Sequence, residues 1–309
     1  MLKRSDAALA ALAVDGVDGV NGVGPAPDAR CFLQTACHRR RMVSRLLGLA
    51  LVASPLALPV ALAREGVEVG KNSAFAKLVP AEDVERSAAQ QYQQMMAEAA
   101  SKNALGPKDH PQVLRLRAIA AKIIPFTLEW NPRAKGWKWE VNLIGSNQIN
   151  AFCMPGGKIA FYSGILEQLK LTDDEVAMIM GHEIAHALRE HARERMGKNA
   201  ATGIGASVLG SLFGLGQLGQ TVTNYGAQLL TLQFSREDET EGDLVGMELA
   251  ARAGFNPQAG VSLWKKMGAA SKGAPPQWLS THPAGATRIA QIEANLPKVM
   301  PLYERARPR

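Results

Sequence analysis

Residues 182–186 read His-Glu-Ile-Ala-His, a pattern that can hold a metal ion. Positions four apart on an α-helix differ by only about 40° in azimuth, so His182 and His186 project from one face. Two imidazoles placed in this way can bind one Zn²⁺, while Glu183 lies beside the metal and faces a water molecule. The motif therefore predicts one zinc ion per chain, with a general base next to it.

A catalytic zinc usually has three protein ligands and one open position for water. Residues 239–243 read Glu-Thr-Glu-Gly-Asp, which places Glu239 and Asp243 on one face of a predicted helix. A carboxylate at Glu239 can complete the ligand set, and Asp243 can accept the free N–H of a ligand histidine. Glu237 and Glu241 flank Glu239 at two-residue spacing and are interpreted as solvated helix charges.

The zinc helix must position both histidines, and its start has a clear signal. Thr172 and Glu175 form a Thr-x-x-Glu capping box before a run of apolar residues at helical spacing. The pattern predicts one helix over residues 173–196, which Gly197 would end. On such a helix His191 lies about 180° from His182, so it is interpreted as structural.

The second helix opens with Ser235 as its N-cap and Asp238 at the third position, and it ends near Gly254. Gly242 lacks a side chain and would let this helix approach the zinc helix closely. Further helices are predicted over residues 81–103, 111–124, 257–270 and 283–296, with a fraying tail after Pro297. Short β segments are predicted over residues 137–144, 148–154 and 158–162, with a turn at 155–157. The expected fold is α+β but mainly α, with a small sheet beside a helix-built zinc site.

The N-terminus has the pattern of a targeting segment. The chain has 309 residues, and residues 42–63 combine a basic start, an apolar stretch and a small-x-small cleavage site, as a signal peptide does. Residues 1–41 are interpreted as an unstructured leader or a mis-assigned start, and residues 64–309 as the folded domain. Export to the periplasm follows from this interpretation.

Composition limits the other classes of function. The net charge is +7 for the whole chain and no basic stripe carries interleaved aromatic residues, so nucleic-acid binding is not expected. After cleavage only Cys153 would remain, which excludes an intramolecular disulfide and favours a buried small hydrophobe. Residues 203–219 contain no charge, and they suit a close-packed helix, a glycine loop, or a surface that contacts a membrane or an unfolded client.

These motifs together resemble the family of zinc metallopeptidases that includes the CAAX prenyl endopeptidase and the bacterial periplasmic peptidase BepA. The likeness extends over residues 80–296, through Asn150-Ala151-Phe152 and the turn after it to Ser280-Thr281-His282-Pro283 and Arg288. The resemblance is closer to small, single-domain periplasmic or lipoprotein members than to integral membrane members, although Gly242 stands where the family often has Ala.

The resemblance implies roles that spacing alone does not. It implies that Glu239 is the third ligand and that Asn150, Ala151 and Phe152 lie along the substrate cleft. It also places His282 near the metal, as a resting-state ligand or an oxyanion donor. Arg288 would help to hold the site or stabilise the oxyanion.

Three hypotheses of function follow. The first is an exported zinc endopeptidase that cleaves misfolded or misassembled envelope proteins, with Glu183 as general base and possible peripheral membrane contact. The second is a periplasmic chaperone or assembly factor with a structural or self-blocked zinc site. The third is a membrane-embedded prenyl-protein processing enzyme. The sequence leaves the oligomeric state open.

Overall fold

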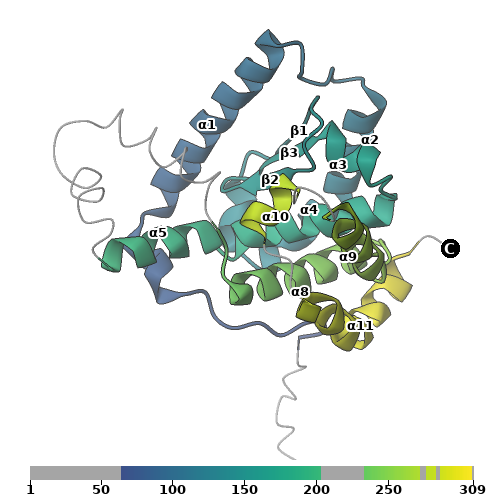
Figure 1. Cartoon of the computed structure of the whole chain (residues 1–309). Coiled ribbons are helices and arrows are strands. Elements are labelled where there is room, and N and C mark those ends of the chain that lie inside the picture. The colour runs from purple at the N-terminus through teal and green to yellow at the C-terminus, as the bar shows by residue number, and fades with distance from the viewer. Residues whose placement is uncertain (1–63, 203–232, 272–275, 283–285, 308–309) are drawn as a thin grey trace, which may run out of the picture. The chain divides into compact units, whose positions relative to one another are not determined.

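The computed structural model describes residues 64–202, 233–271, 276–282 and 286–307 (Figure 1). Within these ranges helices dominate and one three-stranded sheet is present, which confirms the expected zincin-like α+β fold. The predicted leader, the signal peptide and residues 203–219 lie outside the described residues. None of the helices in the described ranges combines the length and the hydropathy that a membrane span requires.

The first described helices are α1 (Ala81–Ser101) and α2 (Pro111–Ile123), as the sequence predicts. Pro111 occupies the first position of α2, where the missing N–H has no helical partner to lose. Short 3-10 helices stand before and after this pair: η1 (Ala74–Leu78), η2 (Ile124–Glu129) and η3 (Pro132–Gly136).

The sheet contains β1 (Glu140–Ile144), β2 (Ala151–Met154) and β3 (Lys158–Tyr162) in the order β1-β3-β2. All three predicted segments form strands, and β2 pairs antiparallel with β3 through a turn. Gly156 and Gly157 in this turn have φ angles of 84° and 77°, which glycine adopts without strain. Because β3 is central, β2 is an edge strand. Helix α3 (Ser163–Gln168), which was not predicted, follows β3.

Helix α4 (Asp173–Leu188) lies between β2 and α8 (Arg236–Arg252) (Figure 1). Every residue from Glu175 to Leu188 is buried. The predicted capping box of Thr172 with Glu175 forms, and the predicted N-cap Ser235 forms one with Asp238 as well. The two helices cross at glycines: a Cβ on Gly181 would lie 2.5 Å from the Gly246 carbonyl oxygen. This close crossing brings the ligands of α4 and α8 together.

The prediction of a single helix over residues 173–196 is wrong. Helix α4 ends at Leu188, Glu190 adopts a left-handed conformation (φ 59°), and a separate helix, α5 (His191–Ala201), follows. Contacts from distant residues stabilise the break. Asn131 Nδ2 donates to the Leu188 carbonyl at 3.0 Å, and the Arg193 guanidinium donates to the Val79 carbonyl at 2.7 Å. Gly197 does not end the helix; it lies inside α5.

The C-terminal helices are α9 (Ala259–Ala270), the unpredicted α10 (Gln277–Thr281) and α11 (Ala286–Ala306). The prediction that α11 ends at Pro297 is wrong, since the helix continues through Pro297 and Pro301. Val299 and Leu302 beyond the first proline are buried in the core. Burial of these apolar side chains offsets the backbone hydrogen bonds that the prolines remove.

Candidate active site

His182 and His186 project from the buried middle of α4 toward α8, on one face as predicted. Each residue is 4% exposed, and their Nε2 atoms lie 3.0 Å apart. The ring of Phe234 stacks on His186 at a centroid distance of 4.0 Å. The two ring nitrogens therefore converge on one point.

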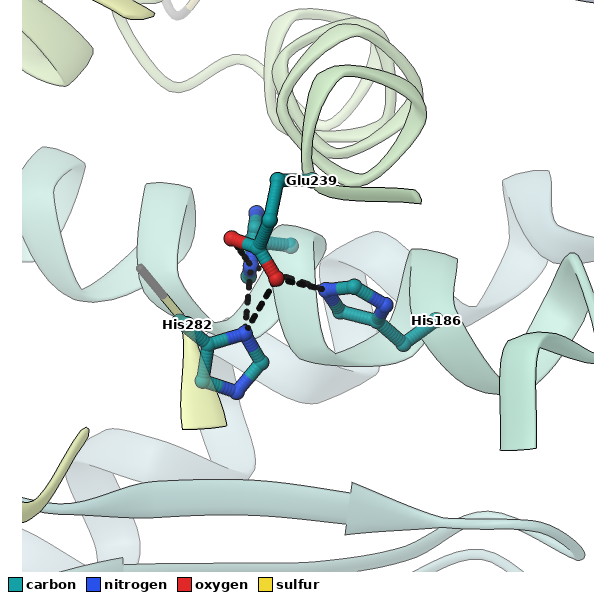
Figure 2. Close-up of side chains that lie close together, drawn as sticks. His186, Glu239 and His282 are labelled. Carbon is teal, nitrogen blue, oxygen red and sulfur yellow. Dashed lines mark hydrogen bonds and ion pairs between the residues drawn. The ribbon is translucent and has the colours of Figure 1, made fainter. Parts of the chain in front are cut away.

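Glu239 reaches the same point from the first turn of α8 (Figure 2). Its carboxylate oxygens lie 3.6 Å from His182 Nε2 and 3.5 Å from His186 Nε2. Burial would raise the pKa of Glu239, but hydrogen bonding to His282 and the charges around it lower the pKa below its ordinary value. The carboxylate is thus kept ionised, as a metal ligand must be.

His282, at the C-terminal end of α10, completes the cluster (Figure 2). Its Nδ1 lies 3.2 Å from His182 Nε2 and 3.0 Å from Glu239 Oε1. Ligand atoms from His182, His186, Glu239 and His282 all lie within 4.8 Å of one another. His282 therefore stands where a fourth ligand would stand.

The spacing of these atoms fits zinc. Tetrahedral zinc with bonds of about 2.0–2.1 Å holds its ligand atoms about 3.3 Å apart. The closest pairs of donor atoms in the cluster are separated by 3.0 to 3.6 Å. Two imidazoles and a carboxylate are also the donor set of many catalytic zinc sites. His182, His186 and Glu239 would hold the ion, with His282 at the remaining corner.

Asp243 and Arg288 lie behind the ligands. Asp243 Oδ1 is 3.1 Å from His182 Nδ1, and the Arg288 guanidinium donates to both Asp243 oxygens at 2.7 and 2.6 Å. Arg288 also pairs with Glu239 and lies 3.8 Å from the ring centroid of Trp264. Burial would raise the pKa of Asp243, but Arg288 and His182 lower it to about 2. Of the roles that the resemblance implies for Arg288, these contacts favour holding the site.

Glu183 faces the same cluster from the other side. It is 3% exposed and accepts a hydrogen bond from Trp278 Nε1 at 2.6 Å. His282 Nε2 lies 3.4 Å from the same carboxylate oxygen. No periodic pattern in the sequence points to Trp278, because α10 is too short to leave one. Its place four residues before His282 was the only available signal.

His191 and Glu241 have other surroundings than the sequence predicts. His191 Nδ1 lies 2.8 Å from His186 Nδ1, and His191 Nε2 lies 3.3 Å from Glu241 Oε2. The helix break at Glu190 turns His191 toward His186, so the azimuth of a continuous helix does not apply. Glu241 is not a solvated charge, because Arg189 Nε also donates to it at 2.7 Å.

A cleft runs past the cluster, and it is lined on one side by Asn150, Ala151 and Phe152 at the edge of the sheet. Glu183, His186 and His282 line it as well. Cys153 is buried in the cleft wall, and burial raises the pKa of its thiol, which agrees with the predicted hydrophobic role.

Gly242 allows the close approach that its sequence position predicts. A Cβ there would lie 2.9 Å from His182 Cε1 and 3.0 Å from His186 Nε2. A larger residue would therefore displace the two ligand rings.

Comparison with known proteins identifies this arrangement. The sequence model of peptidase family M48 matches residues 112–296 of this chain. The chain belongs to peptidase family M48. M48 peptidases are generally zinc-dependent, and the His-His-Glu cluster of this chain could bind the metal.

Individual M48 relatives come from bacteria and from mitochondria. The chain is 34% identical to mitochondrial metalloendopeptidase OMA1 of Schizosaccharomyces pombe over 220 residues, 70% of this chain and 62% of that protein. It is 28% identical to metalloprotease LoiP of Escherichia coli over 203 residues, 64% of this chain and 76% of the relative. It is also 28% identical to the β-barrel assembly-enhancing protease of Yersinia pestis over 169 residues, 52% and 35% of the two chains. The chain thus spans about three fifths of the yeast protein, and these relatives support M48 rather than one branch of it.

Proposed function

We propose that this protein is an exported zinc-dependent endopeptidase that cleaves misfolded or misassembled envelope proteins. One observation carries the proposal: donor atoms of His182, His186 and Glu239 converge at zinc spacing beside Glu183, in a cleft along the edge strand β2. A site that only stabilises the fold has no use for a carboxylate general base next to its ligands.

In this proposal each side chain of the site has its own role in hydrolysis. When bound, zinc lowers the pKa of water toward about 7 and polarises the scissile carbonyl. Glu183 takes the proton from the attacking water and delivers it to the leaving amine. Trp278 holds one oxygen of Glu183 through its indole N–H. His282 is the group placed to donate to the developing oxyanion, because the Arg288 guanidinium pairs with Asp243 and Glu239.

The substrate lies extended along β2 in this proposal. Asn150, Ala151 and Phe152 line the cleft, and the outer edge of β2 has no strand partner among the described residues. Backbone hydrogen bonds to such an edge read the main chain more than the side chains. Broad specificity toward unfolded polypeptides follows from this mode of binding.

Export and substrate class rest on two further supports. Residues 42–63 have the pattern of a cleavable signal peptide, and one relative is named a β-barrel assembly-enhancing protease. We place the mature protein in the periplasm, as a small bacterial member of the family.

The position of His282 favours a second candidate function, an assembly factor whose zinc site is self-blocked. His282 Nδ1 stands at the fourth corner of the cluster, where water would otherwise enter. In this alternative the protein binds its client and leaves it uncut.

Zinc content and casein cleavage, measured side by side for the wild type and Glu183→Gln, test both candidates. We expect both proteins to bind one zinc, because Glu183 is not a ligand, and only the wild type to cleave. Cleavage that survives in Glu183→Gln would exclude the proposed base. A zinc-loaded wild type that does not cleave any unfolded substrate would favour the assembly factor, and a wild type without zinc would contradict both.

A further inference from the structure

The side of His186 that faces away from the metal position has a buried partner. An imidazole that binds zinc through Nε2 carries its remaining proton on Nδ1. His186 Nδ1 lies 2.8 Å from His191 Nδ1, and the two residues are 4% and 2% exposed. Water does not replace this contact readily at such burial, so the His186 proton needs His191 as its acceptor.

The direction of the next hydrogen bond follows from the first. If His191 accepts at Nδ1, a neutral His191 must carry its own proton on Nε2. That atom lies 3.3 Å from Glu241 Oε2, which is an acceptor. Arg189 Nε holds the same carboxylate at 2.7 Å. One assignment of protons therefore satisfies every contact between His186, His191 and Glu241.

We propose that His191 and Glu241 are positioning residues for the zinc ligand His186. The hydrogen-bonded series Glu241–His191–His186, called the relay below, would fix the tautomer and the ring orientation of His186. Partners of this kind orient metal ligands and raise their basicity. The inference rests on the proposed zinc site, but it concerns residues that the His-Glu-x-x-His motif does not include.

Two near-isosteric substitutions of His191 separate the halves of the relay. In His191→Asn the side-chain oxygen takes the place of Nδ1, so it can still accept from His186 but does not reach Glu241. In His191→Gln the amide takes the place of Nε2, so it can still contact Glu241 but offers no acceptor at the Nδ1 position. The two variants are therefore matched opposites.

Zinc affinity, measured on the full-length protein by competition with a chromophoric chelator, is the main readout. We expect His191→Gln to lose about 10- to 100-fold in affinity, as loss of such a partner typically does. His191→Asn should lose clearly less, and the visible spectrum of its Co²⁺ form should stay closer to the wild type. Glu241→Gln should weaken binding more than Glu237→Gln, an exposed carboxylate on the same helix.

The outcomes distinguish the relay from the zinc site itself. A wild type that binds no zinc would contradict the proposed function. A wild type that binds zinc, together with His191→Gln at wild-type affinity or His191→Asn as weak as His191→Gln, would overturn the relay alone. If thermal unfolding of the metal-free proteins shows that the His191 variants do not fold, Glu241→Gln decides the question: an affinity equal to that of Glu237→Gln overturns the relay.

Discussion

His182 and His186 project from the same helix one turn apart, yet their Nδ1 atoms, which face away from the metal position, have different partners. His182 Nδ1 lies directly against the carboxylate of Asp243, which the Arg288 guanidinium grips at both oxygens. His186 Nδ1 lies against Nδ1 of the His191 ring, and Nε2 of that ring faces the carboxylate of Glu241. One ligand has an ionic partner in direct contact, and the other has an aromatic spacer.

This difference extends to burial. Asp243 and Arg288 side chains are 7% and 4% exposed, whereas the Glu241 side chain is 26% exposed. Solvent screens an exposed charge more than a buried one. The contacts that support His182 should therefore be the stronger ones, and their loss should cost more. The contacts that support His186 should be weaker and should tolerate substitution better.

The largest effect is expected where a buried charge loses its partner. Arg288→Met leaves the carboxylates of Asp243 and Glu239 uncompensated, and breaking a buried pair in this way destabilises by about 3–5 kcal/mol. Urea unfolding of the metal-free protein measures this loss. Arg305→Met on the same helix is the control. Its ion pair with Glu65 is largely exposed (57% and 66%), so it should change stability by less than about 1 kcal/mol. Equal losses of unfolding free energy in Arg288→Met and Arg305→Met would contradict the proposed stabilisation of Asp243 and Glu239 by Arg288.

Asp243→Asn and Glu241→Gln each remove one negative charge from α8, so they compare the two supports directly. We expect Asp243→Asn to reduce zinc affinity toward the upper end of about 10- to 100-fold. The reason is that the amide N–H of Asn faces the donors of Arg288. Glu241→Gln should lose less, since His191 still accepts from His186. Chelator competition on both variants gives the ranking, and the reverse order would show that the relay is the stronger support.

Acid should weaken the support of His182 in a defined pH range. The pKa of Asp243 is lowered from its ordinary value of 3.8 to about 2, with burial opposing and Arg288 and His182 lowering it. A lowered pKa stabilises the folded state fully above the ordinary value. That contribution is lost as the pH falls from about 4 toward about 2, and it amounts to about 2 kcal/mol.

The free energy of unfolding of the metal-free protein, followed from about pH 5 downward, tests this assignment. The wild type should lose more stability across the window than Asp243→Asn, which has no carboxylate at position 243 to titrate. Parallel curves for the two proteins would show that Asp243 is not held ionised by Arg288.

Much of the His182 side could be predicted from the sequence, because its information is local. Thr172 and Ser235 mark the starts of α4 and α8, and four-residue spacing then places Glu239 and Asp243 on one face. Strand and turn signals were sufficient for the sheet as well. The resemblance to a known family placed His282 and Arg288 beside these residues, which spacing alone did not do.

The His186 side could not be predicted, because a helix break governs it. No glycine or proline marks the break at Glu190, where contacts from Asn131 and Val79 override the local helical preference. A continuous helix points His191 away from the metal, and the two-residue spacing of Glu241 from Glu239 favoured a solvated side chain. The same dependence on distant packing explains why α11 continues past Pro297.

The smallest expected effect is the coupling between the two supports. Asp243 contacts His182 and Arg288, whereas His191 contacts His186 and Glu241, so the two supports share no direct hydrogen-bond partner among the described residues. They connect through the ligand rings, whose Nε2 atoms lie 3.0 Å apart. Zinc-binding losses of Asp243→Asn and His191→Gln should then add in the double variant to within about 0.5 kcal/mol. Chelator competition on the two single variants and the double variant closes the cycle. A larger coupling would mean that the ligands reorient together through the metal, and the two supports would then act as one.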